Sequence, residues 1–395
     1  MDFKAYQQVL ALQFRGVECP FPAEEFEHRL FRVREQMTVR HLDSLVLTNP
    51  ADIYYLTGYS TFEVSVHTAL LVLPEDLVLQ VPSIEVGPAM TATRVHRVLG
   101  YRWESVDEVL KPLVEVVGAA GREIGMDFWH GSLRQGVVSG LREQLPHCRI
   151  SDASGLMRAI RIVKTPTELA CLQASARITG LGLEAAIAAI RPGISDGEIA
   201  AAGARAMLAE GSEFMSMQPI VTAGWRSSVI HTSHRRHEIG EGDPVFLEFG
   251  SAYQRYTAPM MRTAVAGTPT AEMLEVFDGC QRVHRALCQA MQPGRTFDEV
   301  ARAGEAALAP LADRVFFSGV FGYAVGAQFP PSWVEGSGYI ARGIDELIRP
   351  DMVFHLPVCL RVPGQWGIGC SDTVRVTDKG AVPLTSNPWI LAEAP

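Results

Sequence analysis

The sequence is poor in long hydrophobic runs, in cysteine and in positive charge. No apolar run approaches the ~20 residues needed to cross a bilayer, so we expect no membrane span. The 35 lysines and arginines stand against 44 aspartates and glutamates, a formal net charge of −9. That balance argues against a nucleic-acid partner, because phosphate binding needs a basic surface. The seven cysteines are scattered without a Cys-x-x-Cys pair, which predicts reduced thiols in a cytoplasmic protein and no zinc site.

Two further signals are missing. The first residues lack a basic segment followed by a long apolar one, so no secretory signal is expected. The Gly-Ala-Ala-Gly segment at residues 118–121 lacks the flanking residues of a phosphate-binding loop. We therefore expect no cofactor.

The length and the order of the apolar patterns predict two domains. A chain of 395 residues exceeds what one core usually spans, and 47% apolar residues are ample for a core. Strand-like and helical segments alternate over residues 1–160, which predicts a small α/β domain. The boundary falls near residues 151–164. Thr165, followed three residues later by Glu168, predicts the start of a long helix in the second domain.

One carboxylate stands out in the second domain. Glu248 follows the apolar run at residues 245–247, and burying an acid is costly unless it is paired or used chemically. It could be a structural acid that pairs across a hairpin with Arg255 or Arg262. Its apolar flanks favour catalysis.

A histidine precedes this carboxylate by seventeen positions. His231 follows the apolar pair Val229-Ile230, whereas His234 and His237 lie in a charged segment typical of a solvated loop. His231 could also be an ordinary surface histidine. Its apolar lead-in sets it apart, and an imidazole titrates close enough to neutral pH to move protons.

Several segments together resemble the creatinase and aminopeptidase P superfamily. They are His231 with its spacing to Gly242-Asp243, the turn at 247–256 (LEFGSAYQRY), Arg262-Thr263, Gly-Tyr-Ala-Val-Gly at 322–326, Pro-Asp-Met-Val-Phe at 350–354 and the segment 371–377. The resemblance covers essentially the whole chain. It implies a creatinase-like N-terminal domain over residues 1–160 and an α+β catalytic domain of the pita-bread fold over residues 161–395.

Metallopeptidases of this superfamily hold two divalent ions with two aspartates, one histidine and two glutamates. The matching positions here carry Glu248, Pro259, Tyr323, Pro357 and Ser371. Proline offers no side-chain ligand atom, and neutral tyrosine and serine are poor ligands for hard divalent ions. We therefore expect no metal site.

Within the superfamily the chain is most similar to the metal-free branch, and in particular to ectoine hydrolase. Gly-Tyr at 322–323, Pro-Pro-Ser-Trp at 330–333 and Phe-His at 354–355 carry that similarity. Creatinase instead places acids at positions that hold Met261 and Pro357 here. The resemblance implies a glutamate nucleophile at Glu248.

These residues predict a metal-independent hydrolase that cleaves a C–N bond of a small polar zwitterion. We expect Glu248 to attack or to activate water, and His231 to act as acid or base. Tyr323 could donate a hydrogen bond to developing negative charge, or could simply pack. His355 fits either a core histidine or a site residue.

Other residues are candidates for binding and orientation. Arg226 or Arg262 could hold a substrate carboxylate, and Asp372 is expected to be an orienting acid. The resemblance implies a homodimer in which the N-terminal domain of one subunit closes the other subunit's site. Phe62 and His67 are the expected contributors, although Phe62 could equally pack under a turn.

Three other functions remain open at this stage. A lyase acting on a small zwitterion would use the same histidine and glutamate. An Xaa-Pro-type peptidase would need an unusual metal site, which the four non-ligating replacements oppose. A non-catalytic binding protein on this scaffold is disfavoured because both His231 and Glu248 are present.

Overall fold

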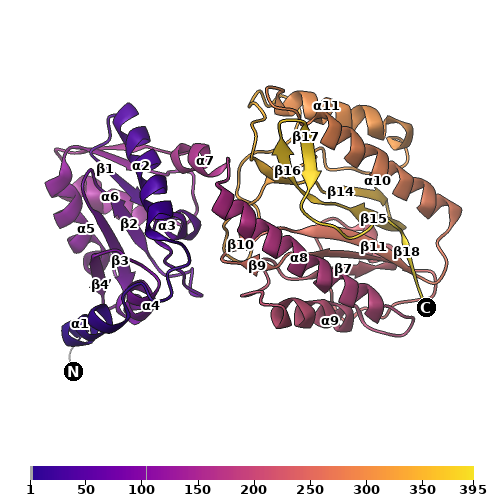
Figure 1. The fold of residues 1–395 in the computed structure, drawn as a ribbon, viewed down its shortest axis with the longest axis horizontal. Coiled ribbons are helices and arrows are strands. Elements are labelled where there is room, and N and C mark those ends of the chain that lie inside the picture. Colours follow the sequence, from indigo (N-terminus) through magenta and orange to yellow (C-terminus); the bar gives the residue numbers. More distant parts are fainter. Residues whose placement is uncertain (1–2, 104) are drawn as a thin grey trace. The chain divides into compact units, whose positions relative to one another are not determined.

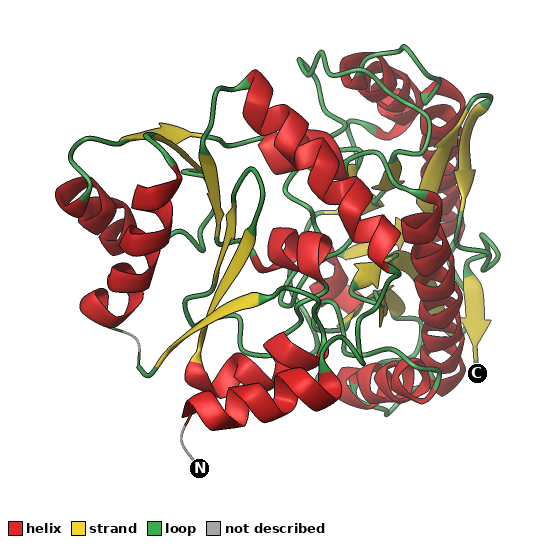
Figure 2. Cartoon of the chain, turned by 60° about the vertical axis from the view of Figure 1, so that its left-hand side comes forward, coloured by secondary structure: helices red, strands yellow, loops and turns green. Residues whose placement is uncertain are grey.

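The computed structural model describes residues 3–103 and 105–395, and its chain divides into two compact units between Arg161 and Ile162 (Figure 1). This division falls beside the expected boundary. The first unit is α/β and the second is α+β, in agreement with the sequence. Helices and strands fill both units, as Figure 2 shows. Among the described residues, none of the helices has the length and apolarity that crossing a membrane requires.

The N-terminal unit is built on one sheet. Its elements are α1 Phe3–Phe14, α2 Ala23–Val39, β1 Ser44–Leu47, α3 Pro50–Thr57, β2 Ala69–Val72, β3 Leu77–Pro82, η1 Ser83–Glu85, α4 Val86–Thr91, β4 Arg97–Tyr101, α5 Val106–Ala120, β5 Glu123–Met126, α6 Gln135–Gln144, β6 Arg149–Asp152 and α7 Leu156–Arg161. The six strands lie in the order β4-β3-β2-β1-β5-β6. Strand β2 is antiparallel to β1 and β3. The pairs β3–β4, β1–β5 and β5–β6 are parallel.

The C-terminal unit has helices on both sides of a group of strands. Its elements are α8 Pro166–Ala189, α9 Asp196–Ala209, β7 Ile220–Ala223, η2 Gly224–Ser228, β8 Pro244–Phe249, β9 Ala252–Tyr253, β10 Tyr256–Thr257, β11 Met260–Ala266, α10 Ala271–Ala290, α11 Phe297–Leu308, η3 Ala309–Leu311, β12 Tyr323–Ala324, β13 Val353–His355, β14 Val358–Val362, β15 Trp366–Cys370, β16 Thr373–Thr377, β17 Gly380–Pro383 and β18 Ala392–Ala394. In Figure 1, α8 and α9 lie on one side of the strands, and α10 and α11 on the other. One sheet has the order β18-β11-β8-β7, a second β12-β13-β16-β17, and β14 pairs with β15.

The helix starts of this unit follow directly from local sequence. Thr165 caps α8 by accepting a hydrogen bond from the backbone N–H of Glu168, whose carboxylate in turn accepts from the Thr165 N–H. The same reciprocal pair begins α9 at Ser195 and α11 at Thr296. Such capping boxes satisfy backbone donors that a helix leaves unpaired at its first turn. The predicted start of a helix at Thr165 is confirmed.

The chain that returns after Glu248 is not one continuous strand. It forms three pieces, β9, β10 and β11, because the backbone turns between them. Gln254 and Arg255 lie at φ 48° and 61°, in the left-handed region, so the chain reverses there. Pro259 lacks the N–H that a continuous ladder needs, and β11 begins only after it.

The two faces of strand β8 contact two different groups of side chains. Val245, Leu247 and Phe249 pack into a core with residues of α8 and α9, whereas Phe246 contacts a different cluster with Met261. Successive side chains of a strand point to opposite faces. Glu248 therefore shares the face of Phe246 and points away from those two helices.

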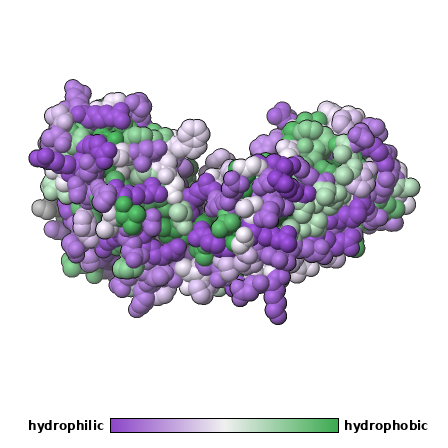
Figure 3. Space-filling model, turned by 90° about the horizontal axis from the view of Figure 1, so that it is seen from above, coloured by the Kyte–Doolittle hydropathy of each residue, from purple (hydrophilic) through white to green (hydrophobic). Residues whose placement is uncertain are grey.

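One face of the molecule can be described by the polarity of its side chains. The face shown in Figure 3 carries mainly hydrophilic residues, with small apolar patches between them. This agrees with the 20% of charged residues in the sequence.

Candidate active site

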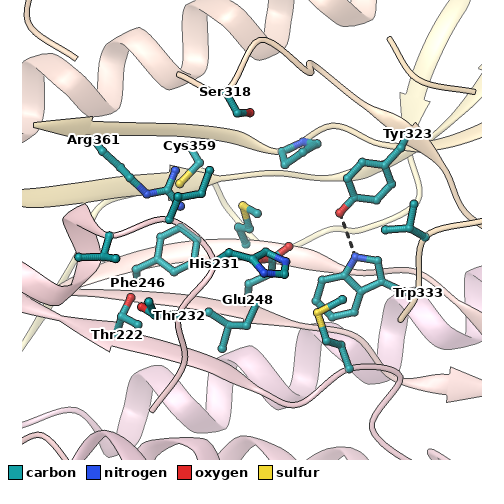
Figure 4. A pocket seen from close by; sticks show the side chains of 17 residues that line it. Thr222, His231, Thr232, Phe246, Glu248, Ser318, Tyr323, Trp333, Cys359 and Arg361 are labelled. Atoms are coloured by element: carbon teal, nitrogen blue, oxygen red, sulfur yellow. Dashed lines mark hydrogen bonds between the residues drawn. The ribbon is translucent and has the colours of Figure 1, made fainter. Parts of the chain in front are cut away.

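A pocket of ≈ 190 Å³ lies in the C-terminal unit, where side chains from β7, β8, β11, β12 and β14 meet (Figure 4). It is lined by Met217, Ile220, Thr222, Val229, Ile230, His231, Thr232, Phe246, Glu248, Met261, Ser318, Tyr323, Trp333, Val334, Pro357, Cys359 and Arg361. Most of these side chains are apolar. The few polar ones among them are where chemistry can take place.

Glu248 is the only carboxylate in this lining. It sits opposite Met261 of β11 and Ile220 of β7, and its side chain is 6% exposed. Burial raises the pKa of its carboxyl to about 8, although the positive charge of Arg361 acts in the opposite direction. At neutral pH the ligand-free pocket therefore holds a largely neutral acid. A substrate that carries positive charge would favour its ionisation.

His231 also lines the pocket, and it is exposed. Its backbone has φ 60°, a left-handed conformation that is uncommon for a residue other than glycine. In the view of Figure 4 its ring lies in front of Glu248. The two residues that the sequence singled out are therefore brought into one pocket.

Tyr323 joins a chain of hydrogen bonds that leads away from the pocket. Trp333 Nε1 donates to Tyr323 Oη at 2.9 Å, and His355 Nδ1 lies 2.8 Å from the same oxygen. On the other side of the ring, His355 Nε2 lies 2.6 Å from Ser371 Oγ. The backbone N–H of Met261 donates to that oxygen at 2.7 Å. Burial and the charge of Glu248 raise the pKa of Tyr323, so its hydroxyl stays protonated.

The hydrogen bonds fix where the protons of this chain lie. Burial lowers the pKa of His355 to about 3, so its ring is neutral and carries one N–H. Ser371 Oγ already accepts from Met261, and the described residues offer the hydroxyl proton of Ser371 no acceptor other than His355 Nε2. His355 therefore holds its proton on Nδ1 and donates it to Tyr323 Oη. Tyr323 Oη then accepts twice, and because this residue lines the pocket we infer that its own proton is directed into the pocket.

Arg361 is the second charged group of the pocket. It lies on β14, is 8% exposed, and places its guanidinium carbon 5.9 Å from the centre of the Phe246 ring. Figure 4 shows Arg361 and Tyr323 on opposite sides of the view, with Glu248 and His231 between them. The pocket thus combines one acid, one imidazole, one permanent cation and several hydroxyls, among them that of Tyr323.

The two cysteines near the pocket are not activated. Cys359 lines the pocket, and Cys370 lies opposite Val358 in the β14–β15 pair. Burial raises the pKa of each thiol to about 12. Both remain thiols at neutral pH, and a thiol is a poor nucleophile compared with a thiolate.

The two arginines expected to hold a substrate carboxylate lie elsewhere, and this expectation is corrected. Arg226 forms an ion pair with Asp196 at 2.8 Å and also donates to the carbonyl of Ser233. Arg262 pairs with Asp372 at 3.0 Å and donates to several backbone carbonyls. Neither lines the pocket. The guanidinium N–H groups of both arginines bind carboxylates and backbone carbonyls of the protein itself.

The remaining predicted residues are also placed outside the pocket lining. Asp372 accepts hydrogen bonds from Arg262, Thr385 and Trp389, which agrees with an orienting acid. His355 is fully buried behind Tyr323 and reaches the pocket only through that hydroxyl. Both are therefore supporting residues rather than groups that contact a substrate.

The two residues of the N-terminal unit behave differently from one another. Phe62 is 94% exposed and is available to contact another molecule. His67 is 2% exposed, and its Nε2 lies 3.1 Å from Gln80 Oε1. The expectation that His67 binds substrate is corrected, because its ring belongs to the interior of its own unit.

The sequence reasoning missed Arg361 and Trp333. Arg361 interrupts an apolar strand, Val358-Cys-Leu-Arg-Val362, in the same way that Glu248 interrupts its own strand. That shared pattern could have identified it. Trp333 belongs to the Pro-Pro-Ser-Trp stretch that carried the resemblance, but its hydrogen bond to Tyr323 appears only in the folded chain.

The residues at the superfamily's metal-ligand positions do not fit two divalent ions. Pro259 and Pro357 have no side-chain donor atom. The hydroxyls of Tyr323 and Ser371 are already engaged with His355 and with other protein donors. Over residues 3–103 and 105–395, no three His, Cys, Asp or Glu side chains cluster in a way that could hold an ion. Glu248 remains as a single carboxylate, too few ligands for such a centre.

Comparison with known protein families identifies both units. Residues 170–378 match the model of "Metallopeptidase family M24", and residues 29–163 match the "Creatinase/Prolidase N-terminal domain". The match to the first family covers more than half of the chain. The expected pita-bread superfamily is confirmed.

Individual relatives span nearly the whole chain. Ectoine hydrolase from Halomonas elongata is 25% identical over 94% of this chain and 98% of its own length. An Xaa-Pro dipeptidase from Pyrococcus furiosus is 24% identical over 91% of this chain and 98% of its own length. Among solved structures, prolidase from Pyrococcus horikoshii superposes with a TM-score of 0.81 at 22% identity, covering 92% of this chain and 99% of that chain. The last comparison supports the two-domain fold.

Proposed function

The chain belongs to metallopeptidase family M24, and within that family we propose that it hydrolyses a C–N bond of a small zwitterion without a metal ion. Its relatives are hydrolases, among them ectoine hydrolase and Xaa-Pro dipeptidases. The observation that carries the proposal is the pocket lining itself. It has one carboxylate, Glu248, and two residues that line it at the superfamily's metal-ligand positions, Tyr323 and Pro357, replace a histidine and an acid.

Glu248 supplies the electron pair for the reaction. In its carboxylate form it either attacks the planar carbon of a C=N or C(=O)–N group, or takes a proton from the attacking water. A cyclic amidine is a suitable electrophile because it is protonated and positively charged. Its charge also lowers the pKa of Glu248 from about 8, so binding of the substrate produces the reactive form of the acid.

His231 and Tyr323 complete the proton balance. Water adds to the carbon, the C–N bond breaks, and the departing nitrogen receives a proton from His231. The Tyr323 proton that points into the pocket donates a hydrogen bond to the charge that develops on the reacting group. Loss of one such donor costs about 2.7–4 kcal/mol in acyl-transfer enzymes.

Ectoine, or a relative of ectoine, is the substrate we propose. The identity to the ectoine hydrolase of Halomonas elongata is 25%, so a related cyclic amidine or an N-acyl diamino acid belongs to the same proposal. A lyase acting on a similar zwitterion is the second candidate, because His231 and Glu248 also suit proton abstraction next to a carbonyl.

The test is a substrate panel read by mass spectrometry, run with and without a chelator. The panel holds ectoine, hydroxyectoine, creatine, Nα- and Nδ-acyl diamino acids and Xaa-Pro dipeptides. A gain of water by an amidine, or loss of the acyl group, that resists chelation is the expected result. Fragmentation without gain of water would favour the lyase. Release of proline from the dipeptides alone, dependent on added metal, would overturn the proposal.

We also propose that the protein is a homodimer in which the N-terminal domain of one subunit covers the site of the other. The exposure of Phe62 supports this, because an aromatic side chain that is 94% exposed is available for a contact. Light scattering at micromolar concentration tests the proposal, and a monomer mass would contradict it.

A further inference from the structure

Arg361 is held rigidly at the pocket wall. Its strand β14 pairs with β15, and Gly367 is its direct partner. A Cβ atom at Gly367 would lie 3.0 Å from Arg361 Cγ and 2.4 Å from the carbonyl oxygen of Ser227. The missing side chain leaves room for the stem of Arg361, whose guanidinium carbon lies 5.9 Å from the centre of the Phe246 ring.

The charge of Arg361 is not compensated by the protein. Its Nε is buried without a hydrogen-bond partner, and no carboxylate of the described residues forms an ion pair with its guanidinium. Glu248 lines the same pocket but does not pair with it. Burying a guanidinium without a counter-charge is costly. A guanidinium that is kept in this state at the wall of a cavity is therefore suited to binding an anion.

The pocket restricts what that anion is. Its volume of ≈ 190 Å³ is below the roughly 300–1,000 Å³ of pockets for drug-sized ligands, so the ligand is small. A dianion such as phosphate would meet only one cation, and its charge would oppose the ionisation of Glu248 in the same pocket. A carboxylate carries a single charge, and its planar geometry matches the guanidinium fork.

We propose that Arg361 binds the carboxylate of the substrate and thereby places its C–N group at Glu248. This assignment rests on the function proposed above. The substrate is then a small carboxylate that also contains an amidinium or amide group. The reacting carbon of that group is separate from the carboxylate carbon. The carboxylate is held on the Arg361 side of the pocket, and the reacting carbon lies towards Glu248 and the inward-pointing proton of Tyr323.

The experiment compares two probes of the same skeleton, N-acetylglycine and N-acetylglycinamide, by titration calorimetry in chloride-free buffer. In the wild type the carboxylate is expected to bind at least about tenfold more tightly than the carboxamide, because a buried charge pair is lost in the latter. Arg361→Gln should abolish that preference. Arg361→Lys, which keeps the charge but not the fork, should retain part of it.

A matched control is available in Arg255, which stacks on Phe214 and Phe329 at 4.5 Å and 4.6 Å but does not line the pocket. Arg255→Gln should leave the carboxylate preference unchanged. Equal affinity of both probes for the wild type would overturn the proposal without relying on any variant. So would an unchanged preference in an Arg361→Gln protein with native circular dichroism.

The outcome separates this site from the proposed reaction. If Arg361→Gln raises KM for a turned-over substrate by about 10²-fold with a smaller change in kcat, both proposals stand. If turnover is found and its KM is unaffected in Arg361→Gln, the carboxylate site is wrong and the reaction stands. If the probes depend on Arg361 but no compound of the panel reacts, the site stands and the reaction is wrong.

Discussion

Two buried arginines of the C-terminal unit accompany a buried carboxylate in different ways. Arg262 is 2% exposed and forms an ion pair at 3.0 Å with Asp372, which is also 2% exposed. Arg361 and Glu248 are similarly buried at 8% and 6%, yet they form no ion pair. Each region therefore combines a buried guanidinium with a buried carboxylate. The two regions differ in whether those two groups form an ion pair.

The difference separates structure from function. Arg262 and Asp372 satisfy one another, and backbone carbonyls and Trp389 take up the remaining donors and acceptors. Arg361 and Glu248 leave their hydrogen-bonding capacity directed at a cavity. Buried charges without partners lower stability, and they are retained where a ligand completes them.

The largest expected effect is the loss of turnover on replacing Glu248, the unpaired carboxylate of this comparison. Glu248→Gln should lower kcat on the true substrate by about 10⁴-fold or more, since the amide can neither attack nor accept a proton. The free energy of unfolding at pH 8 should be unchanged or higher, because the variant removes a charge that is buried without a partner. Steady-state kinetics with thermal denaturation would show this. Wild-type turnover by the variant would remove Glu248 from the mechanism.

The opposite response is expected for the paired arginine. Arg262→Met leaves Asp372 buried without its partner and should lower the free energy of unfolding by about 3–5 kcal/mol. Arg361→Met is the matched control and should not lower it, because no protein carboxylate depends on Arg361. Urea denaturation of the two variants measures the contrast. Equal losses would break the distinction drawn between the two regions.

A smaller effect is expected at Tyr323. Tyr323→Phe keeps the ring but removes the proton that points at the pocket, so kcat should fall by roughly 10²–10³-fold. His355→Phe, which leaves the Tyr323 hydroxyl in place but frees its proton to turn elsewhere, should have a weaker effect on kcat. Activity of Tyr323→Phe within twofold of the wild type would show that this hydroxyl only packs.

Measured over a single pH unit, the smallest effect is a pH dependence of stability. The pKa of Glu248 is about 8 in the folded chain and about 4.3 when unfolded, so the folded state keeps a proton that the unfolded state releases. The stability that neutral Glu248 contributes is complete below about pH 4.3 and is lost as pH rises through about 8. The wild type should lose at most about 1.4 kcal/mol per pH unit relative to Glu248→Gln between these limits. Parallel stability curves for the two proteins would contradict the raised pKa.

Much of the fold follows from local patterns. The capping pair of Thr165 and Glu168 begins α8 as expected, and the alternation of residues 245–249 places Glu248 on the face opposite the helices. The broken return strand was not foreseen, because the left-handed turn at Gln254 and Arg255 leaves no strong signal in those residue types.

The sequence by itself determined that Glu248 is a carboxylate within a strand and that the superfamily's metal positions hold residues without ligand chemistry. Only four of those five positions lack a good ligand, because the fifth is Glu248 itself. These are properties of residue type and spacing, which do not depend on how distant segments pack. Only the tertiary structure decided which arginine serves the site. Arg226, Arg262 and Arg361 have the same chemistry. The clustering of Cys359 of β14 with Phe246 of β8 brings Arg361 to the pocket, while the other two are neutralised by Asp196 and Asp372. Partners far apart in the chain decide the role of a charge, because a buried charge acts through whatever group the fold places beside it.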